Sequence, residues 1–300
     1  MATTHAATGV IAAELERRTP TVGRWRRAGI LIRDNPLGFF GLIVVLILAV
    51  FAISGPLVAP YSPDDFVGAK RLNPSWDHLF GTDNLGRDMF SRVVSGARIS
   101  MTVGFLSVIF GTFVGTVIGI FSGYVRGTVD NLIQRTVDTA IAFPALLLVL
   151  ILRLVLGPSL QTLVIAVGIA IVPPVTRIVR GAVLSESNNQ YVEAARTLGA
   201  STRRILFRHI APNVLPLAII ISTTLLGTAI LAEAALSFLG LGIPSAVTWG
   251  GDVSAARNSF PIHVWWAFFP GAAITLTVLG FNLLGDSLRD MLDPRLRGRL

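Results

Sequence analysis

The chain has 300 residues, of which 52% are hydrophobic and only 14% charged, and it contains no cysteine. Soluble domains carry roughly 25% charged residues, so this composition indicates a membrane protein. Without cysteine the chain can form neither a disulfide framework nor a thiolate metal site. The polar first 36 residues precede an apolar run too long for a cleaved signal, so we expect no secretory signal peptide.

Six apolar segments are long enough to cross a bilayer, which requires about 20 residues each. We place them at 38–59, 101–123, 139–157, 160–179, 214–240 and 264–285. A tight turn at Gly157–Ser159 separates the third segment from the fourth. Pro173 and Pro174, near the inner end of the fourth segment, should break the hydrogen-bond ladder of its helix and bend it. We therefore expect an all-α membrane protein with six transmembrane helices.

Basic residues are distributed unevenly about these segments. Eighteen of the 25 Lys and Arg residues fall on one side and six on the other. By the positive-inside rule, both termini and the 177–212 segment face the cytoplasm, so the net charge of +8 requires no nucleic-acid partner. We expect four parts: a cytoplasmic tail (1–35), a first span with a long extracytoplasmic loop (36–100), a five-span core (101–288) with a cytoplasmic loop at 185–212, and a second tail (289–300).

Two features of the spans bear on packing and function. Gly111, Gly115, Gly119 and Gly123 share one helix face, which favours close helix packing within the subunit over a sliding surface. Among ionisable residues inside spans, Arg153 lies one turn from the outer turn and should snorkel to the interface.

Glu233 lies deeper in its span than Arg153. It could face a translocation path and meet a substrate ammonium, because intramembrane carboxylates are commonly functional. The alternative is a structural hydrogen bond to a neighbouring helix. Both interpretations stay open on the sequence.

A polar stretch between the fourth and fifth spans reads "EAARTLG" at 193–199. Its residues are good helix formers, and Gly199 is a natural helix stop. Ser201 or Thr202 can cap a second helix, and Pro212 and Pro216 mark the return to the membrane. A short helical hairpin between spans is suited to docking onto a soluble partner.

Read on to Pro212, the stretch "EAARTLGASTRRILFRHIAP" resembles the cytoplasmic coupling loop of ABC-importer permeases. The general pattern favours Ile and Leu where this chain has His209 and Ala211, and "RHIAPN" is closer to the peptide-permease branch. The resemblance implies that this loop transmits motion from a separate ATPase into the membrane. The coupling residues that it implies are Glu193, Ala194, Ala195, Arg196, Leu198, Gly199, Ser201, Arg204 and Pro212.

The resemblance covers nearly the whole chain. The segments "NPLGFFGLIVVL", "FGTDNLGRD", "AEAALSFLGLG", "PSAVTWGGDVSAA" and "FNLLGDSLRDMLDPRLRGR" are similar to the C-type membrane subunit of peptide and nickel importers. It implies a type I importer permease in a bacterial or archaeal plasma membrane. Its implied partners are a homologous second permease, two ATPase subunits and an extracytoplasmic substrate-binding protein. Di- or oligopeptides are the implied cargo, with a nickel chelate, glutathione or another small solute as the alternative.

The same resemblance bears on the outer loop, where Asp83, Arg87 and Asp88 either help to receive the binding protein or only brace the loop.

The sequence argues against a nucleotide-binding site and a metal site in this chain. The sequence lacks GxxxxGK[ST], and its one lysine, Lys70, lies in the outer loop, so it cannot supply a Walker A phosphate site. The four histidines show no metal-ligand spacing. We expect a transport subunit that is not an enzyme and holds no cofactor or metal, with ATP and Mg²⁺ bound by partner ATPases. An ion-gradient secondary transporter would carry several midplane charges, whereas only Glu233 is a candidate.

Overall fold

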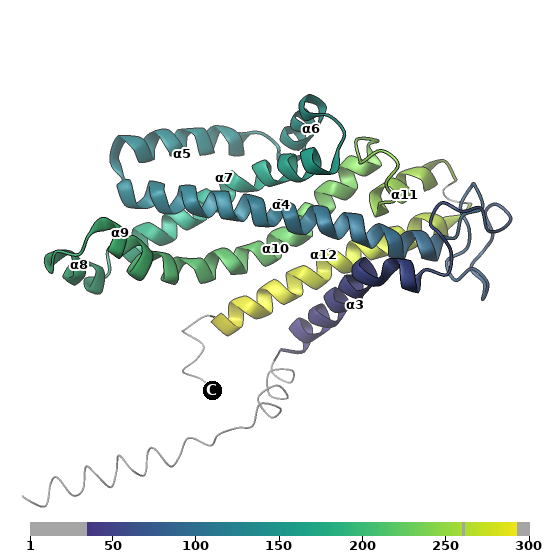
Figure 1. The fold of residues 1–300 in the computed structure, drawn as a ribbon, viewed down its shortest axis with the longest axis horizontal. Helices are drawn as coiled ribbons and strands as arrows, with labels where there is room; N and C mark the ends of the chain where they lie inside the picture. Colours follow the sequence, from purple (N-terminus) through teal and green to yellow (C-terminus); the bar gives the residue numbers. More distant parts are fainter. Residues whose placement is uncertain (1–34, 260–261, 293–300) are drawn as a thin grey trace, which may run out of the picture.

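In the computed structural model the description covers residues 35–259 and 262–292. Long helices lie side by side along one direction and form an elongated bundle (Figure 1). The long helices are α3 (Pro36–Val58), α4 (Met89–Val125), α5 (Gly127–Ala142), α7 (Leu160–Ser187), α10 (Ala211–Phe238) and α12 (Val264–Leu292). The shorter α6 (Ala145–Leu156) runs across this direction (Figure 1). Shorter elements are α8 (Gln190–Thr197), α9 (Thr202–Ile205), a π turn (Leu206–Ile210), α11 (Trp249–Ala256) and a 3-10 turn (Arg257–Ser259).

Five stretches of helix are long and apolar enough to cross a membrane, and the bent pair α5–α6 makes a sixth if it is counted as one span. The described residues therefore form an all-helical protein with five to six candidate spans, as the sequence predicts. The expected terminal tails, 1–35 and 289–300, lie almost wholly outside the described residues.

The predicted third span, 139–157, is wrong as a straight helix. Residues 127–138, expected to be a loop, belong to α5, and α6 follows at an angle of 94°. The break lies at Phe143, whose extended backbone (φ −80°, ψ 135°) precedes Pro144. A residue before proline is driven out of the helical region by contact with the proline ring, which accounts for the bend.

Other prolines do not end their helices. Helix α7 runs from Leu160 to Ser187 with Pro173 and Pro174 inside it, so the helix continues past two residues that have no N–H to donate to the hydrogen-bond ladder. Likewise α9, the π turn and α10 form one continuous stretch from Thr202 to Phe238. The π turn ends just before Pro212, whose missing N–H removes a helical hydrogen bond at this point.

The four glycines of α4 pack against α7, which confirms packing within the subunit. A Cβ on Gly115 would lie 2.9 Å from the carbonyl oxygen of Val172, and one on Gly119 would lie 2.8 Å from that of Thr176. Only a hydrogen at these positions lets the two backbones approach so closely. Helix α4 also extends beyond the expected 101–123 span, because Asp88 caps it at Met89 and no proline interrupts it.

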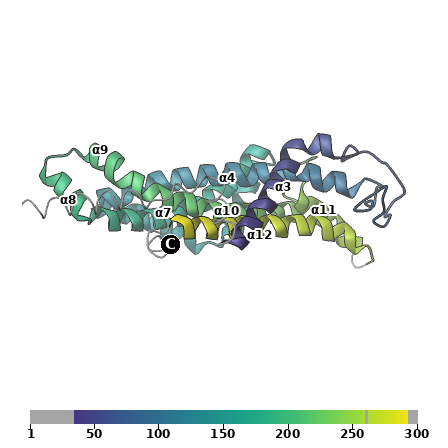
Figure 2. The same ribbon diagram turned by 90° about the horizontal axis from the view of Figure 1, so that it is seen from below.

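The bundle ends in two different extramembrane structures. Helices α8 and α9 lie at one end, while α11 and the loop from 59 to 88 lie at the other (Figure 1). Figure 2 shows the same separation after a quarter turn, so the two ends are far apart in both views. Residues from the coupling stretch and from the outer loop therefore form separate candidate sites.

Candidate functional site

Helix α8 ends in a hydrogen-bonded stop at Gly199. The N–H of Ala200 donates to the carbonyl of Ala195 (3.0 Å), and the N–H of Gly199 donates to that of Arg196 (2.9 Å). Gly199 has φ +77°, a conformation in which glycine carries no Cβ penalty. This pair of bonds is the Schellman motif, so the predicted stop at Gly199 is confirmed.

The coupling residues form an open surface. Glu193, Ala194, Arg196 and Gly199 are exposed, and Ala195 is half-buried. Leu198 is 88% exposed, whereas Val192 on the inner side is fully buried and anchors the helix. An exposed large apolar side chain next to small alanines is what a protein partner can cover.

The second helix of the stretch is shorter than expected. Ser201 caps α9 by accepting a hydrogen bond from the Arg204 N–H (3.4 Å). After one turn the chain passes into the π turn and then directly into α10. Ser201, Arg204 and Pro212 are all exposed, so they extend the open surface from α8 toward the spans.

Tyr191 ties this stretch to the membrane helices, a role that the sequence analysis missed. Its hydroxyl donates to Glu186 at the end of α7 and accepts from Asn213 Nδ2 on α10 (2.9 Å). The hydroxyl also lies 3.3 Å from the carbonyl oxygen of His209 in the π turn. Burial raises the pKa of Tyr191, and the Glu186 carboxylate acts in the same direction, so the phenol keeps its proton. A tyrosine at the start of an otherwise polar helix was the available signal.

At the other end, Asp83 organises the outer loop. Its Oδ1 accepts hydrogen bonds from the N–H groups of Leu85 (2.8 Å) and Arg87 (2.9 Å), and its Oδ2 accepts from Arg87 Nε (2.6 Å). Asp83 is fully buried, while the Arg87 side chain is 18% exposed. The loop's own donors therefore saturate this carboxylate.

Asp88 also bonds within the chain. Its Oδ2 accepts from the N–H and hydroxyl of Ser91 (2.8 and 2.7 Å), and its Oδ1 lies 3.0 Å from His78 Nδ1. It is 1% exposed. Both aspartates brace the loop, and Arg87 offers the most accessible side chain of the three to a docking partner.

A buried ion pair that the sequence analysis missed joins α4 to α11. Arg92 Nη2 lies 2.6 Å from Asp252 Oδ1, and Arg92 Nη1 donates to the carbonyl of Pro63 (2.9 Å). Burial raises the pKa of the Asp252 carboxyl, which the guanidinium opposes. The pair spans 160 positions in sequence, so no local pattern reveals it.

Glu233 lies on α10 and is fully buried within the chain. Its Oε1 accepts a hydrogen bond from Ser237 Oγ (2.7 Å) one turn along the same helix, and its Oε2 has no hydrogen-bond partner within the described part of the chain. Gly250 of α11 covers the neighbouring turn, since a Cβ there would lie 2.2 Å from the Ala234 carbonyl oxygen. Other parts of this chain thus enclose the carboxyl group.

Arg153 does not snorkel, contrary to expectation. It is 2% exposed and its guanidinium donates to the carbonyls of Gly157 (2.8 Å), Ser159 (2.7 Å), Leu241 (3.0 Å) and Gly242 (2.8 Å). Five donors on one planar group can satisfy carbonyls from two loops at once. Arg153 therefore fastens the α6–α7 turn to the chain after α10.

Two parts of the chain match known protein families. Residues 115–298 match the family described as "Binding-protein-dependent transport system inner membrane component". Residues 23–75 match "N-terminal TM domain of oligopeptide transport permease C".

Curated relatives match over almost the full length. The dipeptide transport system permease protein DppC of Alkalihalophilus pseudofirmus is 42% identical over 94% of this chain and 93% of its own. The oligopeptide transport system permease protein OppC of Bacillus subtilis is 41% identical over 91% and 90%. The glutathione transport system permease protein GsiD of Escherichia coli is 42% identical over 94% and 92%.

A solved structure supports the fold. The MetNI methionine ABC transporter, in an inward-facing conformation, contains a chain with a TM-score of 0.57 and 20% identity, covering 68% of this chain and 98% of that one. Permeases of this kind work with a second permease and with separate ATPase subunits that hydrolyse ATP. The chain thus belongs to the binding-protein-dependent transport system inner membrane components, and it is a multi-pass permease subunit of an ABC importer in the bacterial inner membrane.

Proposed function

We propose that this permease forms, with a second permease, the translocation pathway of an importer for di- and oligopeptides. The relatives named for dipeptide and oligopeptide transport, at 42% and 41% identity, support this cargo. The relative named for glutathione transport is equally similar, so glutathione is the main alternative, ahead of a nickel chelate or another small solute.

The observation that carries the proposal is the open surface on α8. Glu193–Gly199 projects at one end of the bundle, and Tyr191 links it to α7 and α10 (Figure 1). We propose that this surface rests on one of two ATPase subunits, which bind the ATP and Mg²⁺. Closure of the ATPases would then move the spans through α8.

We also propose how the chain is oriented in the membrane. The excess of Lys and Arg on the α8 side favours a cytoplasmic position for that end and for both termini. The outer loop and α11 would then face outward, where an extracytoplasmic substrate-binding protein docks. Arg87 is the residue of the outer loop that we propose contacts it.

Three substitutions in the coupling surface test the proposal. Ala195→Trp would overfill a close contact, Gly199→Pro would force φ near −65° where the backbone has +77°, and Glu193→Lys would reverse a charge. Each lies outside the spans, so the protein should still insert into the membrane. Each should weaken ATPase co-purification or reduce peptide uptake per ATP hydrolysed in reconstituted complexes.

Gly240→Pro is a matched control, because Gly240 (φ +81°) stops α10 at the opposite end of the molecule. It should leave ATPase association unchanged. If the three coupling variants hold the ATPase and import peptide like the wild type, the assignment of α8 to coupling is wrong.

A further inference from the structure

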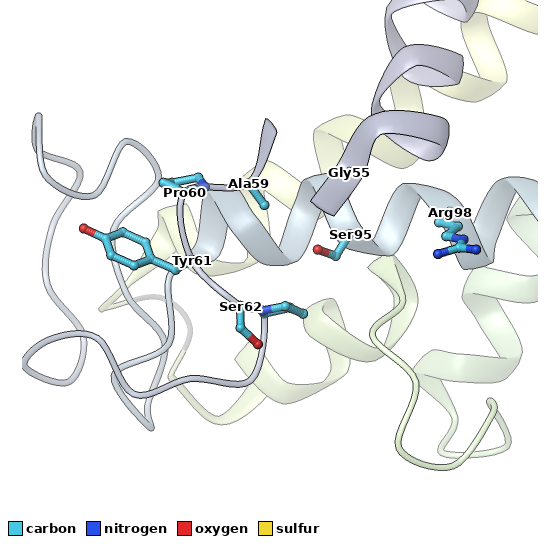
Figure 3. Close-up of a pocket in the computed structure, with 8 residues that line it drawn as sticks. Gly55, Ala59, Pro60, Tyr61, Ser62, Ser95 and Arg98 are labelled. Carbon is cyan, nitrogen blue, oxygen red and sulfur yellow. The ribbon is translucent and has the colours of Figure 1, made fainter. Parts of the chain in front are cut away.

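Three cavities line one face of α4. The first, about 540 Å³, lies between the end of α3, residues 59–63 and α4 (Figure 3). The second, about 560 Å³, lies between α3 and α4, and the third, about 580 Å³, between α4, the π turn and α10. Arg98 lines the first and second, and Phe105 the second and third, so the three cavities adjoin in sequence.

The three cavities together form a strip along one face of α4. Six of the α4 residues that line it recur every three or four positions, which keeps them on one side: Arg98, Thr102, Phe105, Ile109, Thr112 and Thr116. The third cavity reaches Phe207 and Ala211, just after the coupling surface. The strip therefore extends from the outer loop almost to the ATPase end.

Arg98 is the one charged side chain among the residues that line these three cavities. The other lining residues are either apolar or have a hydroxyl group. The Arg98 residue is exposed, and its guanidinium makes no hydrogen bond or ion pair with any other described residue; only its backbone carbonyl is engaged, by the Thr102 hydroxyl (2.6 Å). By contrast, Arg92 on the same helix and Arg153 are fully engaged by internal acceptors. A guanidinium without an internal partner on a membrane helix is suited to bind an anionic group.

We infer that Arg98 receives the terminal carboxylate of the transported peptide at the outer entrance of the pathway. This inference rests on the proposed peptide function. Every linear peptide carries one terminal carboxylate whatever its side chains, and a guanidinium can bind it with two parallel hydrogen bonds. The uncharged remainder of the strip accommodates varied side chains. Glu233, in contrast, is sealed inside the chain and offers no such access.

The test compares one peptide as the free acid and as the C-terminal amide. The complete complex, with its binding protein and ATPases, is reconstituted in proteoliposomes. Uptake is divided by the occupancy of the binding protein, measured separately for each form. Arg98→Gln should lower uptake of the acid about tenfold, the effect of losing a charge-assisted hydrogen bond, and leave the amide unchanged. Arg98→Lys should keep part of the preference for the acid.

Arg257→Gln is the matched control, since it removes an exposed positive charge from the same end of the molecule. It should not alter the ratio of acid to amide uptake. If Arg98→Gln reduces both forms equally, Arg98 contacts lipid or the second permease and the inference fails. If the wild type imports neither form, the proposed peptide function fails instead.

A labelling experiment covers the case in which Arg98→Gln does not assemble. The chain has no cysteine, so Thr102→Cys introduces one thiol next to Arg98 on the strip. The free acid should slow its reaction with a membrane-impermeant thiol reagent during turnover, and the amide should not. Equal protection by both forms would overturn the inference.

Discussion

Glu233 shows how a single residue can suggest function in the sequence and packing in the structure. Its carboxyl group is buried, one oxygen accepts a hydrogen bond from Ser237, and no cation lies within ion-pair distance among the described residues. A substrate ammonium could reach it only after the surrounding parts of the chain move apart. The geometry thus favours the structural interpretation that the sequence left open, while contact with substrate stays a prediction.

Glu233→Gln distinguishes the two roles. The amide has nearly the same shape and still accepts the Ser237 hydrogen bond, so the complex should assemble and import peptide at close to the wild-type rate. Uptake and complex yield are the measurements. A large fall in uptake with normal assembly and normal basal ATP hydrolysis would show that the carboxylate meets substrate.

A substitution of Asp83 can likewise distinguish two roles in the outer loop, namely bracing the loop and contacting the binding protein directly. Asp83→Ala leaves the part-buried N–H groups of Leu85 and Arg87 without their acceptor and removes the ion pair with Arg87. The melting temperature should fall, and binding-protein docking should weaken with it. Asp77→Ala, at an exposed position of the same loop, should change neither. Lost docking at an unchanged melting temperature would indicate direct contact instead.

Local residue patterns were predictable and distant pairs were not. The stop at Gly199 and the cap at Ser201 depend on neighbouring residues, so propensity alone indicates them. Arg92 and Asp252 meet only after 160 residues have folded, and Arg153 binds carbonyls 88 and 89 residues away. Such pairs depend on helix packing that no single stretch encodes.

At the scale of elements, the α4–α7 contact has little room to spare. Gly115→Ala would place its Cβ 2.8 Å from Val175 Cβ and 2.9 Å from the Val172 carbonyl oxygen. Overpacking of this kind costs about 1–3 kcal/mol, so the melting temperature of the purified protein should drop. Gly181→Ala on α7 meets nothing within 4 Å and should not lower it. Equal melting temperatures would mean that the two helices can move apart freely.

Tyr191 of α8 connects this helix to α7 and α10 through hydrogen bonds. Tyr191→Phe removes the hydroxyl that binds Glu186 and Asn213 but keeps the ring. The ATPase should still associate, and peptide uptake per ATP hydrolysed should fall several-fold, because motion of α8 would reach α7 and α10 less directly. Tyr124→Phe is the control, since the Tyr124 ring, 5.8 Å from the Arg196 guanidinium, is retained. Normal uptake by Tyr191→Phe would remove this residue from the coupling route.

The elements themselves were predictable where apolar length decides them. The first, fourth, fifth and sixth spans match α3, α7, α10 and α12 in position. The third failed because hydropathy reports apolar length and not direction, and the chain turns by 94° at Pro144, near the start of the predicted segment. Helix α5 is amphipathic and less apolar than a span, so a hydropathy criterion reads it as a loop.

At the scale of the whole molecule, orientation is the property to test. A reporter fused after residue 300 or inside 185–190 should behave as cytoplasmic, because basic residues gather on that side. A reporter inside 64–80 or 245–258 should behave as external. Alkaline phosphatase and green fluorescent protein fusions report the two sides. An external C-terminus would contradict the proposed orientation.

The continuity from Thr202 to Phe238 has a mechanical consequence. A π turn is equivalent to an α-helix with one inserted residue, and each residue of an α-helix advances the azimuth by about 100°. Deleting one residue from the α-helical part of this stretch would therefore twist α9 by about that angle about the axis of α10, whereas deleting one from Leu206–Ile210 would only convert the π turn into an α turn. The α9 end of this stretch and the buried face of α10 are thus held at a fixed rotation relative to each other, so a rotation of α9 about the helix axis would also rotate α10.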